Sequence, residues 1–108
     1  MANERVLLAG AAEVDITPEM DIQISGDIGR RRPVEEIRER IFARALMLEA
    51  GGTKFCILST ELCSITDDWV EEIRRRAVER VSVEPEAIMV HLVQNHAAPS
   101  LGRALKHQ

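Results

Sequence analysis

Apolar residues recur along this chain with two different spacings, which divide it into expected strands and one expected helix. Residues 6–16 open with an apolar run and then alternate with polar residues, which predicts a strand that ends by Pro18. Residues 54–60 and 87–93 are short, mostly apolar runs, which also indicate strands. Residues 67–81 instead repeat their apolar positions every three or four residues, as an amphipathic helix does.

Residues 34–49 allow two interpretations. Their apolar positions recur at a helical spacing, through Val34, Ile37, Ile41, Ala45 and Leu48. The pair Gly51-Gly52, however, separates this stretch from the strand at 54–60, and two apolar runs around a short glycine turn are typical of a hairpin. We therefore expect a strand over about residues 41–49.

The helix has a clear predicted beginning and a predicted buried side. Thr66 can cap it, and acidic residues follow in its first turn, where they complement the helix dipole. Its buried stripe is expected to contain Val70, Ile73, Ala77 and Val81, with Trp69 at the edge.

The order strand, helix, strand over residues 54–93 predicts a βαβ unit with a right-handed crossover and parallel strands. The run 87–93 is apolar on both sides apart from His91, which favours a central position in the sheet and a hydrogen-bonded core histidine. The sequence thus predicts a single α/β unit over residues 1–108, with a mixed sheet of about four strands and one βαβ crossover.

Composition narrows the class of protein. The 108 residues are 45% apolar with a net charge of −4, which favours a globular domain and argues against nucleic acid as a partner. No apolar run is long enough for a membrane span, and the first residues do not resemble a signal peptide. Cys56 and Cys63 form no recognisable metal-binding or disulfide pattern, so we expect reduced thiols and a cytoplasmic location. The run Arg30–Arg32 is interpreted as a solvated loop, with an anion clamp as the alternative.

Two polar residues directly follow the expected parallel strands. Glu61 comes after 54–60, and His96 comes after 87–93, preceded by Gln94. Ligands of open α/β sheets bind beyond the carboxyl ends of the strands, so a carboxylate and an imidazole there could perform acid–base chemistry or hold a metal. The alternative is that Glu61 caps a loop and His96 bonds to the backbone. Ser100 lacks the surroundings of a catalytic nucleophile and is rejected as one.

Four segments, in order, resemble the neutral/alkaline non-lysosomal ceramidase family. Gly10–Pro18 (GAAEVDITP) resembles the opening motif of that family, and Phe42–Glu49 (FARALMLE) resembles its next segment. Thr53–Cys63 resembles the strand that ends in "DLC", and Asn95–Pro99 (NHAAP) resembles the "HTHSGP" loop. The similarity covers about residues 9 to 102.

The resemblance implies the N-terminal α/β segment of a zinc-dependent amidase that cleaves the N-acyl bond of ceramide. The first histidine of the family's loop binds zinc and the second assists catalysis nearby. His96 matches the second, so it is the first candidate catalytic residue, whereas Gln94 stands at the ligand position. An amide is a poor zinc ligand, so no metal ligand is assigned. Glu61 matches the acidic position of "DLC" and is a weaker catalytic candidate.

Two functional hypotheses follow. In the first, the chain is the N-terminal part of a ceramidase-like hydrolase, with no cofactor of its own; zinc and a lipid-like substrate belong to the complete enzyme, and its partner is the remainder of that hydrolase. In the second, it is a non-catalytic binding or structural module. One crossover helix cannot cover both faces of a sheet, so this module would form a homo-oligomer through the sheet edge or the uncovered face.

Overall fold

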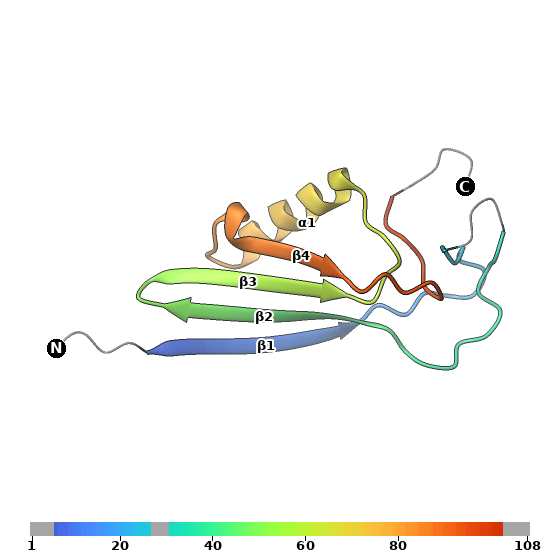
Figure 1. The fold of residues 1–108 in the computed structure, drawn as a ribbon, viewed down its shortest axis with the longest axis horizontal. Helices are drawn as coiled ribbons and strands as arrows, with labels where there is room; N and C mark the ends of the chain where they lie inside the picture. The colour runs from blue at the N-terminus through green and yellow to red at the C-terminus, as the bar shows by residue number, and fades with distance from the viewer. Residues whose placement is uncertain (1–5, 27–30, 103–108) are drawn as a thin grey trace.

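The computed structural model describes residues 6–26 and 31–102 (Figure 1). It confirms the predicted α/β class with a mixed four-stranded sheet in the order β1-β2-β3-β4. Strands β1 and β2 pair antiparallel, as do β2 and β3, whereas β3 and β4 are parallel. The elements are β1 Leu7–Asp15, β2 Phe42–Ala50, β3 Thr53–Thr60, α1 Asp67–Arg80, the 3₁₀ turn η1 Pro85–Ala87, and β4 Ile88–Leu92.

The glycine turn settles the ambiguous second segment as a strand. Gly51 and Gly52 both have positive φ, 57° and 82°, and this is the backbone that a two-residue hairpin turn requires. Ala50 and Thr53 pair directly across the turn, so β2 and β3 are in register from there. This stretch forms a strand despite the helical spacing of its apolar residues, because the turn places it beside β3, with which it pairs.

Helix α1 packs on one face of the sheet, over a small apolar core, although none of its own residues is buried. Cys56, Val83 and Ile88 make a buried cluster, and Ala77 of α1 and Val90 of β4 pack against it. The side chain of Arg74 reaches over the same strand, because its Nε donates to the Ile88 carbonyl at 3.1 Å. The helix therefore covers the part of the sheet formed by β3 and β4, and Figure 1 shows it beside β4, far from β1.

Three details of the predicted helix are corrected. The predicted stripe is only partly buried, because Val70, Ile73 and Ala77 all remain partly exposed. Val81 is 40% exposed, because the helix ends at Arg80 and Val81 has an extended backbone that turns its side chain away from the stripe. Thr66 stands at the N-cap position but makes no side-chain cap bond; its hydroxyl donates to the Asp68 carboxylate instead. That bond lowers the pKa of Asp68.

The predicted central position of β4 is wrong, because β4 lies at one end of the strand order. Its residues alternate in burial: Ile88 is 2% exposed beneath the helix, whereas Met89 is 49% exposed on the other side. The apolar Met89 therefore does not indicate that β4 has a neighbouring strand on each edge. It lies on the face of the sheet that α1 does not cover.

The face opposite α1 is called the open face below. The strand register places two rows of side chains across it, one polar (Glu13, Arg44, Ser59 and His91) and one apolar (Ala11, Leu46, Ile57 and Met89). No helix in the described part of the chain is long and apolar enough to cross a membrane.

Candidate functional site

The loop that follows β4 is fixed by backbone hydrogen bonds to two other segments. The Asn95 N–H donates to the Leu62 carbonyl at 3.1 Å, and the Cys63 N–H donates to the Pro99 carbonyl at 3.0 Å. From the opposite side the Ser25 N–H donates to the Ala98 carbonyl at 3.0 Å, and Ala98 is only 1% exposed. These bonds fix the conformation of the loop. It lies at the carboxyl ends of the parallel strands β3 and β4, which is the position expected for it in a βαβ unit.

His96 lies in this loop with an exposed side chain seated on a glycine. A Cβ atom placed on Gly26 would lie 2.8 Å from the Cβ of His96, so only glycine permits this approach, and the φ of Gly26 is +114°. Arg32 Nη1 donates to the His96 carbonyl at 3.4 Å, and His96 Nε2 lies 3.4 Å from Gln94 Oε1. Nothing in the sequence marks Gly26 as a functional residue except that it is a glycine within a loop.

The Glu61 carboxylate is hydrogen-bonded to the start of β2 and not to His96. Its Oε1 accepts from the Phe42 N–H at 2.8 Å and from Arg44 Nη1 at 3.2 Å. The Glu61 side chain is 32% exposed. This agrees with the alternative in which Glu61 caps a loop: it fixes the point where β2 begins. Arg44 was not among the predicted site residues, and its only signal in the sequence is a charged residue within an apolar strand.

Glu61 and the His96 loop do border one hollow. A cavity of about 490 Å³ is lined by Thr17, Ile41, Glu61, Asn95 and Ala97 among others. His96 itself is not part of this lining, so the two sequence-predicted residues share an edge of the sheet without facing one cavity.

His91 is exposed on the open face, so its predicted core position is wrong. The prediction that it is hydrogen-bonded is confirmed, because its Nδ1 lies 2.9 Å from Ser59 Oγ. The position is exposed because α1 covers the other side of β4, which holds Ile88 and Val90.

The thiols are buried, and the rejected serine is partly buried and hydrogen-bonded. Cys56 and Cys63 are both free and buried, and burial raises the pKa of the Cys56 thiol. Ser64 Oγ donates to Ser100 Oγ at 2.7 Å. Arg30 of the arginine run lies outside the described residues.

The described residues do not fit a zinc site. Within residues 6–26 and 31–102, no three His, Cys, Asp or Glu side chains converge as a metal-binding group. The polar partner of the His96 ring is the amide of Gln94, which is a poor zinc ligand. The chemistry of this loop in the described chain is therefore that of an imidazole beside an amide.

No family model, curated protein or solved structure matches this chain.

Proposed function

We propose that this chain is the N-terminal α/β segment of a ceramidase-like amidohydrolase, in which His96 lies at the edge of the site of N-acyl bond cleavage. The observation that carries the proposal is the fixed His96 loop at the carboxyl ends of β3 and β4. There the imidazole is exposed, its loop neighbours Asn95 and Ala98 are held by backbone hydrogen bonds, and the His96 side chain lies against Gly26. The four family-like segments, in order along the sequence, support the same class.

The role proposed for His96 is proton handling. Amide hydrolysis adds water to the acyl carbon and breaks the C–N bond, so one proton must leave the water and one must reach the departing amine. Imidazole suits both transfers near neutral pH. Gln94 can orient the ring through the Nε2···Oε1 contact of 3.4 Å. The described residues bring together no group of three or more metal-binding side chains, so the metal ligands and most of the lipid-like substrate site are assigned to other segments of the hydrolase.

The two buried free thiols support a reducing, cytoplasmic location for the protein. Glu61 is proposed as a positioning residue, because its contacts fix the entry to β2 and it does not face His96.

A second candidate function is a non-catalytic association module. It is favoured by the open face, where Leu46 is 38% and Met89 is 49% exposed. Exposed apolar side chains grouped on one face are typical of an association surface.

The test is hydrolysis by the gene product expressed from its native start codon to its native stop codon. With a short-chain fluorescent ceramide and a simple N-acyl amide as substrates, we expect turnover that His96→Ala lowers by roughly 100-fold or more. The control is His107→Ala, which changes the same residue type elsewhere in the sequence. Absence of hydrolysis with both substrates, or an unchanged rate in His96→Ala, would contradict the proposal; absence of hydrolysis with a stable dimer would favour the association module.

A further inference from the structure

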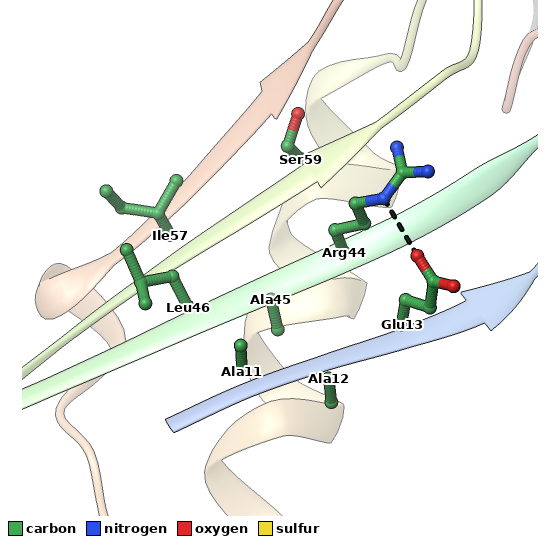
Figure 2. A pocket seen from close by; sticks show the side chains of 8 residues that line it. All are labelled: Ala11, Ala12, Glu13, Arg44, Ala45, Leu46, Ile57 and Ser59. Carbon is green, nitrogen blue, oxygen red and sulfur yellow. Dashed lines mark hydrogen bonds and ion pairs between the residues drawn. The ribbon is translucent and has the colours of Figure 1, made fainter. Parts of the chain in front are cut away.

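A row of polar side chains crosses the open face beside the apolar row. Glu13, Arg44, Ser59 and His91 are direct neighbours on β1, β2, β3 and β4. Arg44 Nε donates to Glu13 at 2.9 Å (Figure 2). Ser59 Oγ lies 2.9 Å from His91 Nδ1. The row therefore has a carboxylate at one end and an imidazole at the other.

The charges on this face do not balance without His91. Arg44 lies between two carboxylates, because its Nη1 also contacts Glu61 at 3.2 Å. At the margin, Asp15 and Arg40 pair with each other at 2.7 Å. One negative charge is left over when His91 is neutral, and burying unbalanced charge is unfavourable. A protonated His91 would remove the imbalance.

We propose that the open face is a homodimer interface in which the Glu13 carboxylate of one copy meets the His91 imidazole of the other. A two-fold axis parallel to the strands, between β2 and β3, keeps each row at the same height and reverses its order. Glu13 then faces the partner's His91, and Arg44 faces the partner's Ser59. This inference is independent of the proposed hydrolase function.

The same operation matches the apolar row by size. It sets Ala11 opposite the partner's Met89, a small side chain against a long one, and Leu46 opposite the partner's Ile57. Such side chains would fit into a shallow hollow of about 470 Å³ whose lining includes Ala11, Leu46 and Ile57. These lining residues are labelled in Figure 2. The complementarity is therefore one of both charge and volume.

The available area suffices for a weak, specific dimer. Four strands at about 4.8 Å spacing and about 26 Å length give a face of roughly 500 Å² per copy. Two copies would bury roughly 1,000 Å², which is the lower limit for a specific interface. Strands related by this axis run nearly in line, as in the common aligned packing of two sheets.

Acidification should strengthen the dimer. Histidine side chains gain their charge as the pH falls from about 8 to 5. The charged groups at this face are Glu13, Arg44 and Glu61, with the Asp15–Arg40 pair at the margin, while α1 packs on the other side. By sedimentation equilibrium of the full chain, we expect the dissociation constant to rise roughly tenfold or more from pH 6 to pH 8. A chain that stays monomeric at both pH values would overturn the proposal.

Mixing two charge variants tests the pairing itself. At pH 6, Glu13→Lys and His91→Asp should each be monomeric, because each homodimer would oppose like charges. Their equimolar mixture should form a heterodimer, since it restores one designed ion pair and one native Glu13–His91 pair. Glu19→Lys is the control, because it makes the same charge change on an exposed loop residue and should leave dimerisation unchanged. Variants that still dimerise alone, or a mixture that stays monomeric, would overturn the pairing.

Folding of the charge variants is checked by circular dichroism. If either variant fails to fold, the milder variant His91→Asn is measured alone in place of the mixing experiment. Its dimer should lose the difference between pH 6 and pH 8, and a difference that persists would overturn the role of His91.

Discussion

The two faces of this sheet are built from the same strands but are stabilised in different ways. On the face toward α1, Ile88 is 2% and Cys56 is 8% exposed, and the side chains form one apolar cluster. On the open face, the neighbouring residues Met89 and Ile57 alternate out of that cluster, and Met89 is 49% exposed. A single residue step along β4 therefore separates a core position from a surface position, because successive side chains of a strand point to opposite faces.

The largest expected difference between the faces comes from truncating neighbouring residues of β4. Ile88→Ala should lower the free energy of unfolding by about 2–4 kcal/mol, because it leaves a cavity under α1. Met89→Ala should cost less than about 1 kcal/mol, because that side chain is half exposed in the monomer. Urea unfolding at pH 8 and low concentration measures both. Equal losses would mean that the open face contributes as much burial as the helix side.

A smaller effect on stability is expected at Gly26, which the exposed side chain of His96 contacts outside the apolar core. Gly26→Ala should cost about 1–3 kcal/mol, because the new Cβ meets His96 at 2.8 Å and the φ of +114° strains any L side chain. It should also shift the NMR signals of the His96 ring. Gly10→Ala is the control: nothing lies within 4 Å of its added Cβ, so it should be neutral or slightly stabilising. If Gly26→Ala moves neither stability nor the ring signals, His96 is not seated on that glycine.

The sequence predicted the elements of this fold well because their signals are local. The Gly51-Gly52 turn, the alternation in β1 and the helical repeat of α1 each act within a few neighbouring residues. The edge position of β4 could not be predicted in the same way. An apolar residue such as Met89 gives the same sequence pattern whether a helix or solvent covers its face of the sheet. Only the three-dimensional arrangement distinguishes the two cases.

The candidate site was predicted by position but not by contacts. The rule for carboxyl ends of parallel strands placed Glu61 and His96 at one edge of the sheet, which the structure has. The bonds of Glu61 to Phe42 and Arg44, and the seat of His96 on Gly26, join segments far apart in the sequence. No local spacing encodes such contacts, and for this reason the structural role of Glu61 was only one of two alternatives.

The smallest expected effect concerns the polar margin of the open face, where ion pairs take the place of burial. The Thr17 side chain, then the Thr17 N–H and Arg40, lower the pKa of Asp15 from its ordinary 3.8 to about 2. A carboxyl group whose pKa is lower in the folded state stabilises the fold above its unfolded pKa, and this contribution disappears as the pH falls from about 4 through 2. Asp15→Asn should therefore reduce stability slightly at pH 7, and the difference from the wild type should vanish near pH 2. The effect is small because the groups are exposed to solvent.

Thermal unfolding between pH 2 and pH 7 measures this difference. Asp21→Asn is the control, since that exposed residue has a φ of 70° that asparagine also tolerates. A difference that is constant with pH would show that Asp15 acts through its hydrogen bonds alone and that its charge does not stabilise the open face.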